Sequence, residues 1–123
     1  MKTFIIIGAI NAFLSVALGA FGAHALEGKI SQKYIDIWNT GVLYQMFHAI
    51  GIIIVGVLMG NVTPTSLLSW SGWLMLIGTI LFSGSLYVLS LSGIKVLGAI
   101  TPLGGVSFLA AWVLLIVFAA KTL

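Results

Sequence analysis

Four long apolar stretches, each free of charged residues, constrain this sequence more than any other feature. Each stretch reaches the roughly 20 residues that a helix needs to cross a hydrocarbon core about 30 Å thick. The sequence therefore predicts an all-α integral membrane protein, an antiparallel bundle of four transmembrane helices at residues 3–25, 41–60, 67–91 and 96–120. The charged residues all lie outside these stretches: Lys2, Glu27, Lys29, Lys33, Asp36, Lys95 and Lys121.

The composition excludes several other classes of protein. Only 6% of the residues are charged and 61% are hydrophobic, whereas soluble domains carry roughly 25% charged residues. Cysteine is absent, which excludes disulfides, thiolate metal sites and cysteine nucleophiles. The five basic residues are dispersed lysines, so the net charge of +3 does not indicate nucleic-acid binding. We expect one domain, residues 1–123, in the plasma membrane with lipid around it.

The first apolar stretch has a second interpretation, a cleaved signal peptide. Lys2 precedes it, and Ala23-His24-Ala25 resembles a cleavage site. However, the apolar run is as long as a full span and exceeds the usual core of about 7 to 15 residues. We therefore expect this stretch to remain as a transmembrane helix.

Small residues form a stripe along the first span at steps of three and four residues. Such a stripe lets a neighbouring helix approach closely and replaces lipid contacts with helix packing. The same glycine faces could also be used between copies, so a homo-oligomer or a membrane-protein partner is a further alternative. The stripe consists of Gly8, Ala12, Ser15, Gly19 and Gly22.

The segment between the first two spans predicts a short amphipathic helix. Ile30, Tyr34, Ile37 and Trp38 recur at helical spacing among polar residues. With Tyr34 and Trp38 at its apolar edge, this helix is expected in the headgroup layer, leading into the second span. A solvated loop is the alternative.

Spans two and three are joined by a predicted turn at residues 61–66, which is rich in Asn, Pro, Thr and Ser. A short turn makes these two helices antiparallel neighbours. Trp70 and Trp73 near the start of the third span, and Tyr87 near its end, follow the distribution of an aromatic belt.

The fourth span is interrupted by Thr-Pro-Leu-Gly-Gly at residues 101–105. Residues 106–120 alone would give only about 22 Å of helix, too short to cross the membrane. The residues before Pro102 must contribute, which predicts a kinked or locally unwound helix. Because freed backbone groups need partners, we expect this stretch inside the bundle and away from lipid.

Polar residues within the spans are the candidate functional site, because such groups are costly in a membrane. Tyr44, Gln45 and His48 are three and four residues apart, which predicts one helical face turned towards Asn11 or Ser83. The simplest role is a network of hydrogen bonds between helices, each worth about 0.6 kcal/mol. The candidates are Asn11, Tyr44, Gln45, His48, Ser83, Thr101, Pro102, Gly104 and Gly105.

The two histidines raise the question of a cofactor. His24 and His48 would differ in depth by roughly 8 Å, whereas two axial ligands of one haem share a layer. No carboxylate lies within a span, so we expect no metal and no cofactor. His24 and Glu27 are expected at the interface, as a helix terminus or a pH-sensitive pair. No paired catalytic groups are visible, so we expect no enzyme.

Four motifs occur together and in order, and through them the chain resembles the YgdD/YwdK-like family of small bacterial membrane proteins, which has a eukaryotic relative. The resemblance covers essentially the whole chain. It implies four spans in the plasma membrane and no established activity. The motifs are GAFGAH at 19–24, Thr40-Gly41 with Tyr44, Gln45 and His48, LFSGSLY at 81–87 and TPLGGVSFL at 101–109.

Two functional hypotheses follow. The first is a non-enzymatic structural or regulatory module whose polar interior binds a partner or a lipid. The alternative is a transporter or channel for ions or small solutes, in which oligomers or the broken fourth helix provide a polar path.

Overall fold

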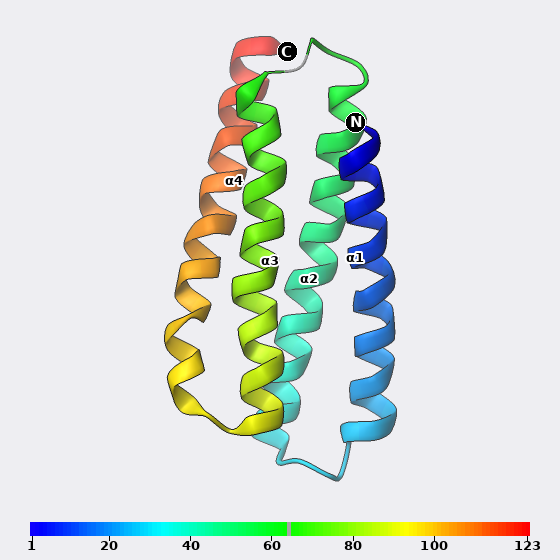
Figure 1. Cartoon of the computed structure of the whole chain (residues 1–123), viewed down its shortest axis with the longest axis vertical. Coiled ribbons are helices and arrows are strands. Elements are labelled where there is room, and N and C mark those ends of the chain that lie inside the picture. The colour runs from blue at the N-terminus through cyan, green and yellow to red at the C-terminus, as the bar shows by residue number, and fades with distance from the viewer. Residues whose placement is uncertain (64) are drawn as a thin grey trace.

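The computed structural model describes residues 1–63 and 65–123 and confirms the predicted four helices. They are α1 (Lys2–Phe21), α2 (Gln32–Met59), α3 (Ser66–Ser92) and α4 (Thr101–Thr122). Their lengths and compositions suit membrane crossing, and they alternate in direction so that both termini lie at one end (Figure 1). The predicted turn at 61–66 joins α2 to α3, and its Pro64 lies outside the described residues.

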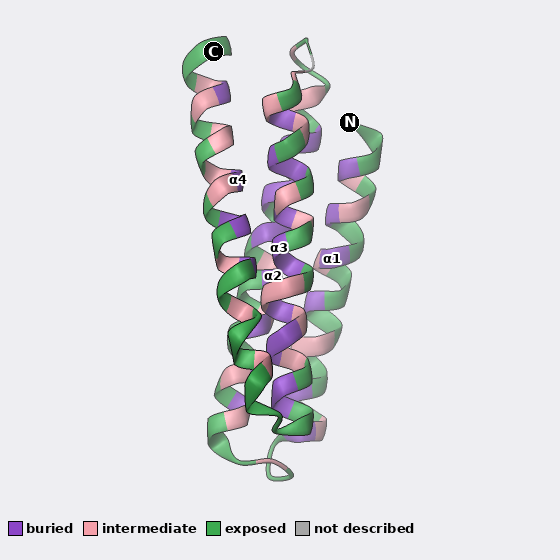
Figure 2. Ribbon diagram, turned by 60° about the vertical axis from the view of Figure 1, so that its left-hand side comes forward, coloured by how far each residue is buried: buried purple, intermediate pink, exposed green. Residues whose placement is uncertain are grey.

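The helices follow one another across the bundle, with α2 and α3 in the centre. Helix α1 packs on α2, α2 on α3, and α3 on α4 (Figure 1). Buried residues accordingly gather where helices face each other (Figure 2). The outer helices keep wide lipid-facing surfaces, as the exposed Phe13 in α1 and Leu109 in α4 illustrate. This layout leaves α2 and α4 as neighbours without close backbone packing.

Close packing of α1 on α2 confirms the role expected for the stripe of small residues. A Cβ atom on Gly8 would lie 2.8 Å from the carbonyl oxygen of Ala49, and one on Gly22 would lie 2.6 Å from Nε1 of Trp38. Ser15 is fully buried. The small side chains therefore allow backbone-to-backbone contact between the two helices.

The segment predicted as a separate interfacial helix is helical, but it forms the first turns of α2. Neither proline nor glycine interrupts residues 32–40, so the helix continues into the span. Trp38 also does not face the lipid: it is 2% exposed, and its Nε1 donates to the carbonyl oxygen of Leu18 at 2.9 Å. An indole N–H needs such an acceptor in an apolar layer, which draws Trp38 between α1 and α2.

The predicted interruption of the fourth span is present. A 3₁₀ helix, η2 (Lys95–Ala99), precedes α4, and Pro102 occupies the first turn of α4, where no N–H is required. The stretch expected inside the bundle, residues 101–105, is divided between two environments: Gly104 is buried against α3, whereas Leu103 is 60% exposed. Hydrogen bonds from Leu97 N to Ile94 O and from Ile100 N to Leu97 O pair the backbone locally, so no neighbouring helix is needed.

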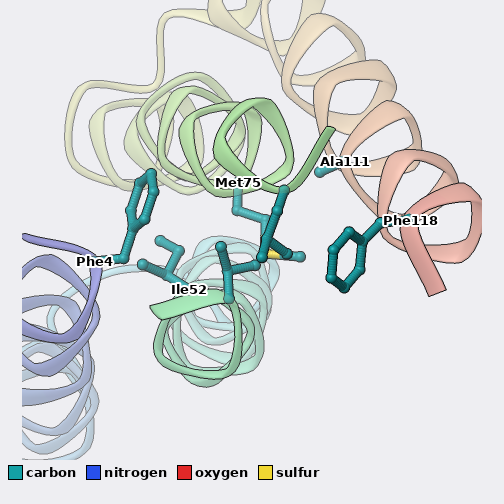
Figure 3. Packing of buried hydrophobic residues seen from close by; sticks show 7 residues of the cluster. Phe4, Ile52, Met75, Ala111 and Phe118 are labelled. Atoms are coloured by element: carbon teal, nitrogen blue, oxygen red, sulfur yellow. The ribbon is translucent and has the colours of Figure 1, made fainter. Parts of the chain in front are cut away.

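The apolar core lies towards the end that carries the termini, and all four helices contribute to it. Phe4 of α1 and Phe118 of α4 approach from opposite sides of Ile52 and Met75 (Figure 3). A second, smaller cluster of Leu26, Ile35 and Trp38 closes the other end of the α1–α2 contact. Along α1 and α2, the buried Asn11 and Gln45 lie between the two clusters.

Candidate functional site

A buried network of polar side chains links α1, α2 and α3, with Gln45 at its centre. Its Nε2 donates to Oδ1 of Asn11 at 3.1 Å, and its Oε1 accepts from the hydroxyl of Tyr87 at 2.6 Å. Nδ2 of Asn11 donates to the carbonyl oxygen of Ile7 at 3.0 Å. Both functional groups of the Gln45 amide are therefore used, and they fix the register of three helices.

The same region contains a second side-chain bond between α2 and α3. The hydroxyl of Ser83 donates to the carbonyl oxygen of Gly41 at 2.7 Å. Gly41 also allows the Tyr87 ring to approach, since a Cβ atom there would lie 2.9 Å from the ring. Among the described residues, the hydroxyl of the buried Ser15 is left without a partner.

We expect Gln45 and Tyr87 to be energetically coupled. Gln45→Leu leaves the Tyr87 hydroxyl and the Asn11 amide with one partner fewer, whereas Tyr87→Phe removes the donor itself. A double-mutant cycle in mixed micelles is expected to give a coupling energy of about 0.6 to 1.7 kcal/mol. Strictly additive effects on the free energy of unfolding would contradict this bond.

A groove with a volume of about 750 Å³ opens to the outside of the bundle between α2 and α4. Six of its eleven lining residues are aromatic or imidazole rings, and Phe82 of α3 contributes to its inner wall. A smaller hollow of about 290 Å³ extends it along α2 to Ile54. The lining residues are Leu43, Tyr44, Phe47, His48, Phe82, Pro102, Gly105, Val106, Phe108, Leu109 and Trp112.

His48 forms the floor of this groove and connects α2 to α4. Nε1 of Trp112 lies 3.0 Å from Nε2 of His48, and Nδ1 of His48 lies 2.8 Å from the carbonyl oxygen of Tyr44. An indole N–H can only donate, so Nε2 must accept and the proton belongs on Nδ1. The ring of Phe108 stacks on the imidazole at 3.5 Å. This neutral imidazole therefore has both nitrogens paired within the protein.

Hydroxyl groups also tie α3 to α4. Ser71 donates to the carbonyl oxygen of Ala111 at 2.8 Å, and Ser107 donates to that of Leu74 at 2.7 Å. The hydroxyls of Ser85 and Thr101 are 2.6 Å apart. Each bond crosses between the helices, as polar residues do in membrane bundles.

The structure does not bring the nine predicted site residues together. Tyr44 and Gln45 are adjacent on α2, and adjacent helical residues point about 100° apart. Tyr44 therefore enters the groove while Gln45 turns towards α1 and α3. Asn11, Gln45 and Ser83 belong to the polar network, Tyr44, His48, Pro102 and Gly105 line the groove, and Thr101 and Gly104 lie in the α3–α4 contact.

Several residues of the polar network and of the groove were not predicted from the sequence. Tyr87 was assigned to an aromatic belt, but it lies inside the bundle against Trp38 at a ring separation of 4.7 Å. Phe108 and Trp112 were not singled out. Their spacing of four residues, with Gly105 three residues before Phe108, marks a face of α4 that could have revealed the groove.

The predicted interfacial pair lies at the opposite end of the bundle from the termini. His24 is in the π-helical turn η1 (Gly22–Leu26) that ends the first helix, and Glu27 follows it. Both side chains are exposed. Among the described residues, no group of three His, Cys, Asp or Glu lies together as metal ligands would.

Four long apolar helices joined by interior hydrogen bonds define a small polytopic helical membrane protein. The family described as "Protein of unknown function (DUF423)" matches residues 18–105. The chain is 55% identical to the UPF0382 membrane protein YwdK of Bacillus subtilis (strain 168), over 100% of both chains. It is 52% identical to the UPF0382 membrane protein SH2409 of Staphylococcus haemolyticus (strain JCSC1435), over 98% of both chains.

The chain therefore belongs to this family of bacterial membrane proteins, and the resemblance seen in its motifs is confirmed. It is a multi-pass protein of the bacterial membrane. The family description and the names of these relatives assign no specific activity. No solved structure matches the chain.

Proposed function

We propose that this protein is a non-enzymatic membrane module that holds the hydrocarbon chain of a lipophilic molecule in the groove between α2 and α4. The observation that carries the proposal is the groove itself, with its ring-rich lining and its opening towards lipid. Its volume of about 750 Å³ falls within the range of roughly 300 to 1,000 Å³ that is typical of small-molecule sites.

The chemistry of the lining favours an apolar chain. Its polar side chains are Tyr44, His48 and Trp112, and the last two are already bonded to each other. Aromatic rings offer large contact areas and lose little conformational entropy when a ligand binds. A hydrocarbon chain can therefore gain dispersion contacts along the whole groove without separating the paired His48 and Trp112 side chains.

The polar network supports this function from the other side of α2. Bonds from Gln45 to Asn11 and Tyr87 hold α2 against α1 and α3. The opposite face of α2 then stays at a fixed distance from α4. In this proposal the network is structural, and the groove is the binding site.

Filling the groove is expected to exclude the chain. A Cβ atom on Gly105 would meet its nearest neighbour, Cδ2 of Phe82, only at 4.0 Å, so Gly105→Leu places a side chain in the groove without displacing a helix. We expect brominated phospholipids to quench Trp112 fluorescence roughly twofold less in this variant, because the leucine occupies the space of the chain. Trp70→Phe and Trp73→Phe remove the two exposed indoles from the background.

The matched control is Gly84→Leu in the same background. A Cβ atom on Gly84 would also meet no atom within 4 Å, but Gly84 does not line the groove. Trp38 remains as a shielded reference, since it is 2% exposed. Equal quenching of Trp112 in the two leucine variants would refute chain binding in the groove.

A further inference from the structure

We propose that the ligand of this groove is an isoprenoid quinone, a membrane-embedded molecule with a flat ring, hydrogen-bond-accepting carbonyls and a long apolar tail. This inference rests on the proposed function, because it assigns a ligand class to the same groove. It follows from one hydroxyl, its depth in the membrane and the rings around it.

The hydroxyl is that of Tyr44. The imidazole of His48 and the indole of Trp112 are paired with each other, and Nδ1 of His48 is paired with the Tyr44 carbonyl. The Tyr44 side chain is 40% exposed, and its hydroxyl forms no hydrogen bond with any residue in the described part of the chain. Tyr44 is thus the remaining donor on the groove wall.

Depth decides what can accept this hydrogen bond. Tyr44 lies about 18 Å along a helix about 42 Å long, so with α2 centred in a hydrocarbon layer of about 30 Å the Cα of Tyr44 lies about 12 Å inside that layer. Water and phospholipid headgroups stay outside that layer, and an unpaired hydroxyl within it is costly. A suitable acceptor must belong to a molecule that itself lies in the hydrocarbon layer, as the carbonyl of an isoprenoid quinone does.

The rings around Tyr44 favour a flat partner. Its ring centroid is 4.5 Å from that of Phe82 and 6.4 Å from that of Phe108, and the Phe108 ring is nearly parallel to it. Flat rings stack favourably on aromatic side chains in offset or edge-on arrangements. The hollow that continues along α2 from Phe47 to Ile54 is apolar and suits an isoprenoid tail.

The test compares a quinone with an analogue that lacks only the carbonyl oxygens. The full chain, in the Trp70→Phe and Trp73→Phe background, is placed in phosphatidylcholine nanodiscs. A benzoquinone with two isoprene units and the corresponding isoprenylated benzene are each titrated as competitors of a phospholipid that carries a photoreactive diazirine on one acyl chain. Crosslinks to the groove are counted by mass spectrometry, because a quinone would itself quench Trp112 fluorescence. We expect the quinone to compete about three- to tenfold better, the range for one net hydrogen bond.

Tyr44→Phe is expected to remove that preference, while Tyr34→Phe, which lies outside the groove, retains it. Equal competition by the two molecules in the unsubstituted protein overturns the quinone assignment, even if Tyr44→Phe folds poorly. If Gly105→Leu still lowers quenching in that case, chain binding stands and only the ligand class is wrong. A preference that survives Tyr44→Phe also overturns the assignment, because the carbonyl would then be recognised elsewhere.

Discussion

Replacing Gly104 with leucine is expected to destabilise the bundle by about 3 kcal/mol, the upper part of the usual range for overpacking. A Cβ atom on Gly104 would lie 2.7 Å from Cβ and 2.8 Å from Cα of Phe82, and it would also collide with the Phe82 backbone nitrogen. Because backbone atoms of α3 cannot rotate away, α4 must move outwards. The bonds from Ser71 and Ser107 across this contact would then lengthen.

The neighbouring Gly105→Leu provides a matched comparison with the same substitution in the same helix. Its Cβ atom meets nothing closer than 4.0 Å, and leucine favours a helix over glycine by roughly 0.5 to 1 kcal/mol. Unfolding in mixed micelles with increasing dodecyl sulfate would measure both variants. If Gly104→Leu were as stable as Gly105→Leu, the close approach of α4 to Phe82 would be wrong.

Trp38→Ala is expected to cost about 3 kcal/mol of unfolding free energy, at the low end of the range for truncating a buried Phe or Trp. Part of this cost in soluble proteins is the free energy of moving the side chain from water into the core. That contribution is smaller here, because lipid tails are as apolar as a protein core. The lost packing against Phe21 and Tyr87 remains, together with the hydrogen bond to Leu18.

The control for this substitution is Trp70→Ala, which removes an indole that is 58% exposed near the start of α3. We expect this change to cost under about 1 kcal/mol, as surface substitutions do. Trp38→Phe separates the two contributions, since it keeps most of the ring packing and loses the N–H donor. Similar losses for the two alanine variants would mean that the Trp38 side chain is not buried between α1 and α2.

The helices were predictable because the membrane imposes a simple rule on them. Residues 3–25, 41–60, 67–91 and 96–120 each contain enough uncharged residues to span the hydrocarbon layer, and four helices of suitable length are present. The boundaries were less predictable. Helix α2 begins nine residues before its predicted span, at Gln32, because polar residues such as Gln32 and Asp36 continue a helix as readily as they form a loop.

Part of the polar network could be predicted from the sequence, but the groove could not. The cost of polar groups in hydrocarbon singled out Asn11, Gln45 and His48, and each one forms side-chain hydrogen bonds. The groove depends on Phe82, Phe108 and Trp112, which are ordinary residues of an apolar span when read in sequence. They form a site because α4 meets α2 there across Phe82.

The sequence by itself therefore determined the number of helices, their apolar character and the polar groups that need partners. Hydrocarbon forces each backbone to bond within its own helix, so length and charge alone mark the spans. Tertiary structure decided which way each side chain points. The helices are apolar all round, so hydrophobic periodicity does not specify an inward face, and the stripe of small residues indicates one only for α1. Only the order of packing, α1 to α4 across the bundle, sends Gln45 to α1 and α3 and leaves Tyr44 in the groove.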